Sequence, residues 1–214
     1  MLRTLFLQAP SFDGFDGGAG SRYQAKREIK SFWYPTWLAQ PAALVENSKL
    51  IDAPPHKTTL AEVVAQAKDY DHLVVHTSVP SFKSDVKVVE AMKAANPNLL
   101  VGMIGAKVAV NAEGSLREAP VIDYAARNEF DFTVKDVADE IPLKDIKGIT
   151  YRTSRDAIVN NDDRPMIENM DSLPFVTPVY QRDLKIENYF IGYLKHPYIS
   201  MYTGRGCKSR CTFC

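Results

Sequence analysis

The order of apolar segments along the first 140 residues is the feature that most restricts how this chain can fold. Short, largely apolar runs alternate there with stretches whose apolar residues recur at helical spacing. The runs lie at residues 2–7, 50–51, 73–75, 99–105 and 121–122. Strands that are apolar on both faces are typical of a parallel sheet with helices packed on each side. The sequence therefore predicts an α/β fold, a doubly wound parallel sheet, over about residues 1–141.

Helices are expected between these runs. Apolar residues recur at helical spacing in residues 37–45, where Pro41 is expected to kink the helix, and again in residues 82–92 and 134–141. The clearest helix begins at Thr59-Leu60-Ala61-Glu62, a capping-box pattern that precedes an apolar face.

The pattern changes at Pro142. Residues 143–164 are expected to form a small hairpin, and the proline-containing stretch that follows is expected to be a linker with local structure. Residues 198–203 are predicted to form a strand that leads into a cysteine-containing loop. The predicted organisation is a doubly wound domain at 1–141, a hairpin and linker at 142–197, and the start of a further domain at 198–214.

Composition and charge exclude several classes of protein. The chain carries 26 basic and 26 acidic residues, so it lacks the positive field of a general nucleic-acid binder. Its longest apolar run, residues 99–106, is far shorter than the roughly 18–20 residues of a membrane span. The residues that follow Met1 do not have the pattern of a signal peptide. We therefore expect a soluble, cytoplasmic protein with no nucleic-acid partner and no transmembrane segment.

All three cysteines lie within the last eight positions, at Cys207, Cys211 and Cys214. An odd number of cysteines so close together is no disulfide framework, and such pairs constrain little chain entropy. A metal site is the better interpretation, because thiolates bind iron strongly and a tight loop brings three of them together. Three ligands on a four-iron cluster leave one iron open. A domain rarely ends on its own ligand, so we expect the sequence to be a piece of a longer protein.

The residues near the cysteines favour this interpretation, and the alternatives are redox-active thiols or a zinc site. Arg205, Lys208 and Arg210 are expected to stabilise thiolates and an anionic cluster. A structural zinc ion takes four ligands and would make the chain a zinc-stabilised interaction protein. His196 is the only histidine near the cysteines in the sequence.

The Cys-x3-Cys-x2-Cys spacing, with aromatic Phe213 directly before the third cysteine, resembles the signature of radical S-adenosylmethionine (SAM) enzymes. The resemblance implies that Cys207, Cys211 and Cys214 hold a [4Fe-4S] cluster whose fourth iron is chelated by SAM. It also implies that the backbone of Phe213 lies near the adenine. In such enzymes an electron, supplied by a donor such as flavodoxin or ferredoxin, cleaves SAM to a 5′-deoxyadenosyl radical that abstracts hydrogen from a substrate.

The preceding domain resembles the cobalamin-binding domain of one radical SAM subgroup. Residues 127–133 resemble the Gly-Glu-x-Glu-x-Thr turn of that subgroup, and residues 171–174 resemble its Asp-x-Leu-Pro segment. Ligands of open parallel sheets bind outside the carboxyl ends of the strands, where a flat corrin requires small residues and close backbone approach. The residues that the resemblance places near cobalamin are Phe15, Thr77, Ser78, Gly105 and Ala106.

The axial ligand of the corrin can be examined in the sequence. Many cobalamin proteins supply a histidine from Asp-x-His-x-x-Gly, whereas this chain has Phe15 at the histidine position of residues 13–18. Phenylalanine cannot donate to cobalt, so we expect cobalamin to bind without a protein histidine ligand. His76 at a strand end is an alternative ligand, although a hydrogen-bonded structural role is expected for it. The same substitution leaves open a radical SAM enzyme whose N-terminal domain contains no corrin.

Within the subgroup, residues 12–20 and 22–28 resemble the hopanoid-biosynthesis-associated radical SAM proteins. That resemblance implies a role in forming the cyclitol ether head group of bacteriohopanetetrol, and hence a small-molecule or lipid substrate. A signalling receiver domain shares the alternating architecture but needs an acidic pair after its first strand and an aspartate after its third. This chain has residues 8–10 (Gln-Ala-Pro) and 76–78 (His-Thr-Ser) there instead. We expect residues 1–214 alone to be inactive, because the substrate pocket requires the rest of a barrel.

Overall fold

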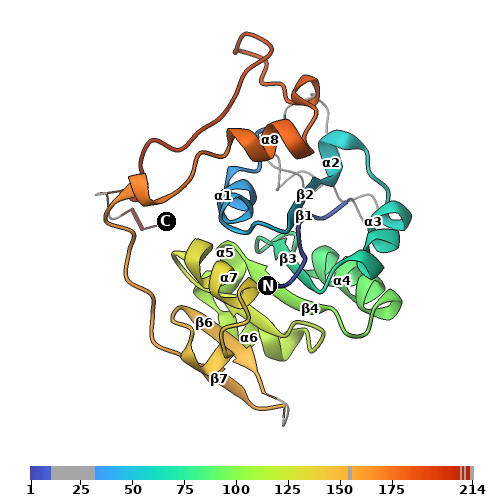
Figure 1. Ribbon diagram of the computed structural model, residues 1–214, viewed down its shortest axis with the longest axis vertical. Coiled ribbons are helices and arrows are strands. Elements are labelled where there is room, and N and C mark those ends of the chain that lie inside the picture. Colours follow the sequence, from blue (N-terminus) through green and yellow to red (C-terminus); the bar gives the residue numbers. More distant parts are fainter. Residues whose placement is uncertain (11–31, 154–155, 208, 210, 213–214) are drawn as a thin grey trace.

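The structure, a computed structural model of the chain, describes residues 1–10, 32–153, 156–207, 209 and 211–212 (Figure 1). These residues contain one seven-stranded sheet with the strand order β2-β1-β3-β4-β5-β6-β7. The first five of these are parallel, and the order 2-1-3-4-5 is that of a doubly wound fold. The predicted fold class is confirmed. The strands are β1 (Thr4–Gln8), β2 (Ser48–Asp52), β3 (His72–His76), β4 (Leu100–Ile104), β5 (Tyr124–Ala126), β6 (Ile149–Arg152) and β7 (Ile158–Asn160).

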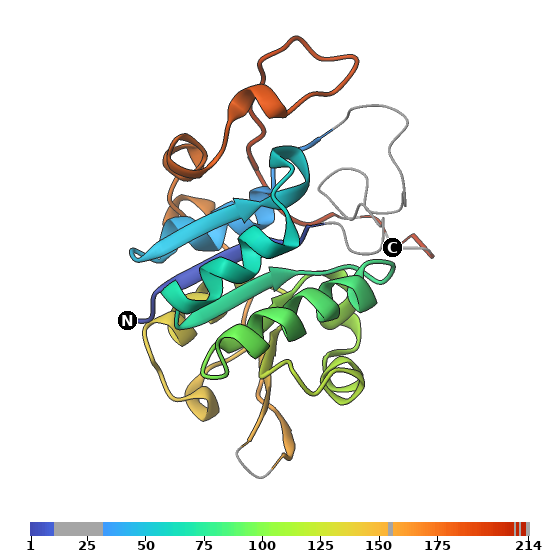
Figure 2. The same ribbon diagram turned by 90° about the vertical axis from the view of Figure 1, so that its right-hand side faces the viewer.

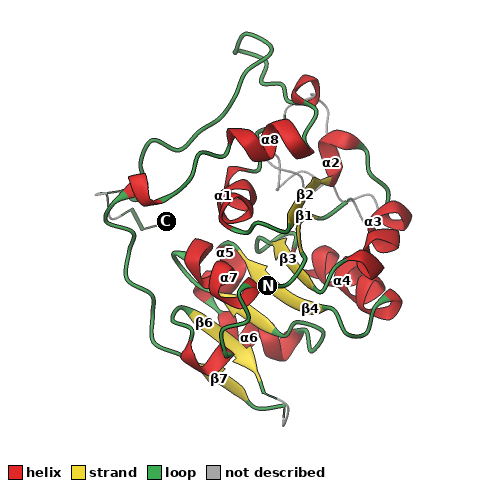
Figure 3. Cartoon of the chain, viewed as in Figure 1, coloured by secondary structure: helices red, strands yellow, loops and turns green. Residues whose placement is uncertain are grey.

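Helices cover both faces of the sheet (Figures 2 and 3). One face packs against α1, α7 and α8, and the other against α3 to α6. The α-helices are α1 (Thr36–Leu44), α2 (Ala53–His56), α3 (Leu60–Gln66), α4 (Phe82–Ala95), α5 (Ala106–Val110), α6 (Ala112–Glu118), α7 (Phe130–Ala138) and α8 (Thr177–Asp183). Short 3-10 helices span Ala67–Asp69, Leu143–Asp145, Met170–Ser172 and Ile186–Asn188.

The strands bury alternate side chains in two separate cores. In β3, Val74 packs into the core beneath α1, α7 and α8, whereas Leu73 and Val75 pack into the core beneath α3 to α6. All three side chains are fully buried. Because successive side chains point to opposite faces, the central residues of a strand covered on both sides are apolar. This is the physical origin of the apolar runs in the sequence.

The helix boundaries follow local sequence signals. The predicted capping box is present at α3, where the Thr59 amide donates to Glu62 Oε2 at 2.7 Å and the Glu62 amide donates to Thr59 Oγ1 at 3.3 Å. Helix α7 ends earlier than expected and leaves Ile141 exposed. Glu140 has a positive φ of 63°, and the Ile141 amide donates to the Asp136 carbonyl, which is the geometry of a Schellman cap.

Two predicted strands differ from the structure. Residues 121–122 lie in a turn, and the strand forms later, at Tyr124–Ala126. Ile122 is fully buried although it pairs with no strand, so its apolar character reflects the core and not the sheet. Residues 198–203 form no strand either. A strand needs a neighbour to accept its backbone hydrogen bonds, and no described strand pairs with this segment.

The hairpin expected after Pro142 is present as the antiparallel pair β6–β7. It extends the sheet, because β6 also pairs antiparallel with β5. Arg127 ties the hairpin to the end of β5: its Nη1 donates to the Ile149 carbonyl at 2.8 Å and its Nη2 to the Asn161 carbonyl at 2.6 Å. The division of the chain at residue 141 stays a prediction.

The stretch from residue 165 onward returns along the α1 side of the sheet. A cluster of tyrosines fastens it there, with Tyr34 stacked on Tyr189 at 4.1 Å between ring centroids and close to Tyr180 and Tyr198 at 4.6 and 5.5 Å. The hydroxyl of Tyr189 donates to buried Asp52 at 2.7 Å. In the part of the chain that the structure describes, no helix combines the length and apolar character needed to cross a bilayer.

Candidate cofactor site at the carboxyl edge of the sheet

The carboxyl ends of the parallel strands form the edge at which ligands of doubly wound folds bind. The chain runs from β1 outward to β2 and then crosses to β3 on the other side of β1, so the direction of winding changes between β1 and β3. The loop that follows β1 falls in residues 11–31. Phe15 and the glycines around it therefore lie outside the described residues, and their predicted contact with cobalamin stays a prediction.

Gly105, at the end of β4, is a position that only glycine fits. Its φ is +107°, and a Cβ atom there would lie 2.2 Å from the Thr77 carbonyl oxygen and 2.9 Å from His76 Nε2. Both distances are shorter than real Cβ contacts. Ala106 follows it, exposed, as the first residue of α5. The loop after β4 thus packs directly on the turn after β3, and two small residues follow the strand at this edge.

Thr77 and Ser78 are buried, and their hydroxyl groups bond within the fold. Thr77 Oγ1 donates to Asp85 Oδ2 at 2.7 Å, and the Ser78 and Ser81 hydroxyl oxygens are 2.8 Å apart. The Ser78 carbonyl accepts from the Phe82 amide, which starts α4. These side chains shape the turn after β3. The contacts predicted between Thr77, Ser78 and cobalamin stay predictions.

His76 is packed into the same edge. The ring is 4% exposed and lies beside Trp37 of α1, with the ring centroids 5.0 Å apart and the planes tilted by 42°. It also lies beneath Gly105, as the short distance to a Cβ atom there indicates. His76 is therefore held between a helix and a loop of the sheet edge, as a structural histidine would be.

The segment that leads into the cysteines, residues 204–206, lies at this edge as well. Cys207 and Cys211 are exposed free thiols, whereas Cys214 and Phe213 lie outside the described residues. The backbone N–H of Ser209 donates to Cys207 Sγ at 3.4 Å, which lowers the pKa of that thiol and favours the thiolate that binds metal. Among the described residues no three acidic, histidine or cysteine side chains form a metal-binding group. The donor set fits iron in its chemistry, and its assembly stays a prediction.

Arg205 has partners that the sequence did not indicate. It was expected beside the thiolates, but its guanidinium binds the carboxylates of Glu129 (3.0 Å) and Asp131 at the start of α7. These acids belong to the turn singled out as residues 127–133, so two separate motifs of the sequence meet here. A cavity of about 390 Å³ lies beside this contact and is lined by Trp37, Asn128, Glu129, Phe130, Tyr202, Gly204, Arg205 and Gly206.

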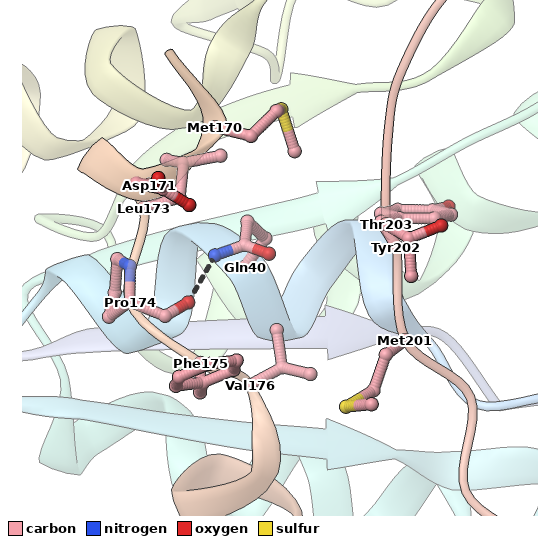
Figure 4. Close-up of a pocket in the computed structure, with 10 residues that line it drawn as sticks. All are labelled: Gln40, Met170, Asp171, Leu173, Pro174, Phe175, Val176, Met201, Tyr202 and Thr203. Atoms are coloured by element: carbon pink, nitrogen blue, oxygen red, sulfur yellow. Dashed lines mark hydrogen bonds between the residues drawn. The ribbon is translucent and has the colours of Figure 1, made fainter.

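A second cavity, of about 410 Å³, lies between α1 and the segment that leads to the cysteines (Figure 4). The Asp-x-Leu-Pro motif at residues 171–174 lines one side of it, and residues 201–203 line another. Gln40 Nε2 donates to the Pro174 carbonyl at 2.7 Å, which joins the motif to α1. The motif therefore has a structural role in placing the returning segment beside the sheet.

No protein-family model matches the chain. It is 30% identical over 198 residues to a protein of Pyrococcus horikoshii named "Uncharacterized methyltransferase PH0819", an alignment that covers 88% of this chain and 42% of that protein. The chain thus spans less than half the length of this relative.

Among solved structures, the fold resembles that of OxsB, a cobalamin-dependent S-adenosylmethionine radical enzyme. With aqua-cobalamin and S-adenosylmethionine bound, OxsB matches at a TM-score of 0.60 and 12% identity, over 77% of this chain and 23% of OxsB. With aqua-cobalamin alone the TM-score is 0.59 over the same shares. The likeness shows a common α/β fold. Both similar proteins are described by their names as enzymes.

Proposed function

We propose that this chain is the N-terminal part of a cobalamin-dependent radical SAM enzyme. The observation that carries the proposal is the position of the cysteine loop, which Arg205 holds against the carboxyl edge of a doubly wound sheet. That edge is where such folds bind ligands, and the sequence places three cysteines at radical SAM spacing directly after Arg205. The fold likeness to OxsB supports the same assignment.

The residues have distinct roles in this proposal. Cys207, Cys211 and Cys214 would hold a [4Fe-4S] cluster, and Phe213 would border the adenine of SAM. Gly105 would keep the loop after β4 close to the turn after β3, because any side chain there would collide with the Thr77 carbonyl, and the corrin would lie along the edge that these two loops form. The cluster would supply the electron that cleaves SAM. The chain itself positions the loop and shapes the cofactor edge, and cobalamin would bind without a histidine from the loop that carries Phe15.

Our proposal for the substrate rests on the resemblance to HpnJ, the hopanoid-associated radical SAM protein. We propose a small-molecule or lipid substrate of the kind found in cyclitol ether head groups, a flavodoxin or ferredoxin as electron donor, and a cytoplasmic location. The Pyrococcus horikoshii relative is named a methyltransferase, which supports methyl transfer from SAM as a second reaction outcome. Product analysis separates the two: methyl transfer leaves S-adenosylhomocysteine, and hydrogen abstraction leaves 5′-deoxyadenosine with methionine.

The deciding experiment is anaerobic reconstitution of the full protein with iron, sulfide and cobalamin, followed by metal analysis and absorption spectroscopy. We expect about four irons and one cobalt per chain. Iron without cobalt would leave a radical SAM enzyme with a corrin-free first domain. Zinc without iron would overturn the enzymatic proposal in favour of a zinc-stabilised interaction protein.

Matched variants assign each metal to its site. Cys211→Ser is expected to lose iron and keep cobalt, whereas Ser209→Ala keeps both. Gly105→Val is expected to lose cobalt and keep iron, because its side chain would collide with the Thr77 carbonyl and displace the loop that forms the edge. Gly192→Val is the control, since a Cβ atom at Gly192 meets nothing within 4 Å. Cobalt retained by Gly105→Val would remove this edge as the corrin site.

A further inference from the structure

We propose that Arg205 is a positioning residue that fixes the cysteine loop to the corrin-binding edge through Glu129 and Asp131. We call these three residues the Arg205 clamp. The proposal rests on the proposed function in one respect: that function assigns an iron–sulfur cluster to the loop and cobalamin to the edge. The contact between them stands on the geometry of the described residues.

The clamp is better shielded from water than a typical surface ion pair. Arg205 Nη1 donates to Glu129 Oε2 at 3.0 Å and also to Asp131 Oδ2. The side chains of Arg205 and Glu129 are 20% and 19% exposed, and that of Asp131 is fully buried. Exposed ion pairs contribute little to stability, but removing one partner of a buried pair leaves an uncompensated charge. The Asp131 carboxylate therefore strongly favours the position in which Arg205 reaches it.

The acidic side of the clamp is fixed to the sheet. Glu129 and Asp131 follow β5 by a few residues, at the start of α7. Just before them, the Arg127 amide donates to the Gly148 carbonyl at 2.7 Å, and the Arg127 side chain binds the carbonyls of Ile149 in β6 and of Asn161 directly after β7. The carboxylates thus belong to a rigid part of the molecule.

The basic side of the clamp lies two residues before the first predicted cluster ligand, Cys207. Glycines flank it, and Cβ atoms built on Gly204 or Gly206 would meet nothing within 4 Å. The neighbouring backbone is therefore open, and the position of the loop at this point depends on the Arg205 side chain. Through the clamp, the position of a cluster ligand is coupled to the edge proposed for cobalamin.

Limited trypsin digestion of the chain without cofactors tests the contact itself. Trypsin must take the arginine side chain into its own pocket, so the clamp protects the bond after Arg205. In Asp131→Asn we expect cleavage after Arg205 to become at least about tenfold faster, since a tenfold change corresponds to the loss of about 1.4 kcal/mol of protection. Cleavage after exposed Lys195 is the internal reference and should not change.

Two further variants keep this test decisive. If Asp131→Asn accelerates cleavage at Lys195 as well, the variant has unfolded and Glu129→Gln replaces it, because Glu129 is partly exposed and its loss leaves no buried charge. Glu113→Gln removes the exposed partner of Arg117 and is the matched control, with no expected effect at Arg205. Equal cleavage after Arg205 in the wild type and Glu129→Gln, with Asp131→Asn equal or unfolded, overturns the clamp.

The reconstituted protein tests the coupling between the two sites. A reduced [4Fe-4S] cluster and cob(II)alamin are both paramagnetic, and their magnetic dipolar coupling decreases with the cube of the distance between them. We expect Arg205→Ala to bind wild-type amounts of iron and cobalt. In electron paramagnetic resonance, its dipolar coupling should be weaker on average and more broadly distributed than that of the wild type. Arg205→Lys, which keeps the charge but not the fork geometry, should lie between the two.

The two experiments separate the failure of the clamp from the failure of the proposed function. Unchanged coupling in Arg205→Ala overturns Arg205 as a positioning residue even when both metals are bound. A wild-type protein that binds neither iron nor cobalt overturns the proposed function, while the trypsin result on the cofactor-free chain still decides whether the clamp exists.

Discussion

The two ends of strand β3 carry the same residue type in very different surroundings. His72, at the amino end, is fully buried and uses both ring nitrogens: Nδ1 is 3.0 Å from Thr4 Oγ1 and Nε2 is 2.6 Å from the Tyr124 hydroxyl. His76, at the carboxyl end, lies beside Trp37 and beneath Gly105 at the edge proposed for cobalamin. At the amino end, hydrogen bonds to Thr4 and Tyr124 satisfy the buried histidine. At the carboxyl end, the histidine lies next to the loop that begins with Gly105.

This difference separates stability from function along a single strand. Burial lowers the pKa of His72 to about 3, so the ring is neutral and its hydrogen bonds are structural. Ligands of doubly wound sheets bind at the carboxyl ends, so the amino ends are free to serve the fold. Changes at the amino end should therefore reduce stability and leave the cofactor edge intact, whereas changes at the carboxyl end should alter cofactor binding.

The largest expected effect comes from a glycine that packs against Tyr124, the partner of His72. A Cβ atom on Gly102 of β4 would lie 2.0 Å from the ring of Tyr124, which is fully buried and cannot move aside. We expect Gly102→Ala to lower the free energy of unfolding by about 3 kcal/mol, the upper range for overpacking, because it also breaks the bond to His72. Urea denaturation measures the loss. Gly192→Ala is the control, and a loss below about 1 kcal/mol would contradict the prediction.

Acid should weaken the amino end through His72. The folded state holds this histidine neutral while the unfolded chain protonates it below pH about 6.5, so stability falls as pH drops from about 6.5 towards 3. The slope is about 1.4 kcal/mol per pH unit, which gives about 2 kcal/mol between pH 6.5 and 5. Denaturation curves of the wild type and His72→Gln at several pH values isolate this contribution from that of the carboxylates. Parallel pH dependence in the two proteins would show that His72 does not cause it.

Tyr124→Phe is expected to have an intermediate effect. It removes the hydroxyl bonded to His72 Nε2 and leaves a buried polar atom without its partner, at a cost of about 1–2 kcal/mol. Cobalt binding by the reconstituted protein should not change, because Tyr124 lies beside the amino end of β3. Tyr70→Phe is a control for loss of a less buried tyrosine hydroxyl. Loss of cobalt in Tyr124→Phe would contradict the separation of the two ends.

The sheet was predictable because its signals are local. The centre of a buried strand such as β3 is a continuous apolar run in the sequence. The cap formed by Thr59 and Glu62 involves only four consecutive residues. The strand β5 was misplaced because Ile122 is apolar for packing and not for pairing. A strand at 198–203 was expected from composition alone, although pairing requires a neighbour that no sequence window contains.

For the candidate site, the sequence supports a hypothesis about chemistry but does not indicate which residues come together. The spacing of Cys207, Cys211 and Cys214 indicates metal binding without any knowledge of the fold. The pairing of Arg205 with Asp131 joins residues 74 positions apart, and charge patterns in sequence do not specify such partners. Asp131 did carry one usable signal: an acidic residue in the first turn of a helix, within a turn already marked as a motif. Its burial became visible only in the structure.

The smallest expected effect is also the one that bears most directly on the cofactor. His76→Gln should change the free energy of unfolding by about 1 kcal/mol or less and should leave the absorption spectrum of bound cobalamin unchanged. The reason is that His76 is packed between Trp37 and Gly105, and its ring is held by the fold. Anaerobic spectra of the wild type and the variant at equal cobalt content provide the comparison, with exposed His196→Gln as the control. A shifted spectrum in His76→Gln alone would make His76 the axial ligand. The carboxyl end of β3 would then supply a ligand to the cobalt of cobalamin, in addition to shaping the edge around it.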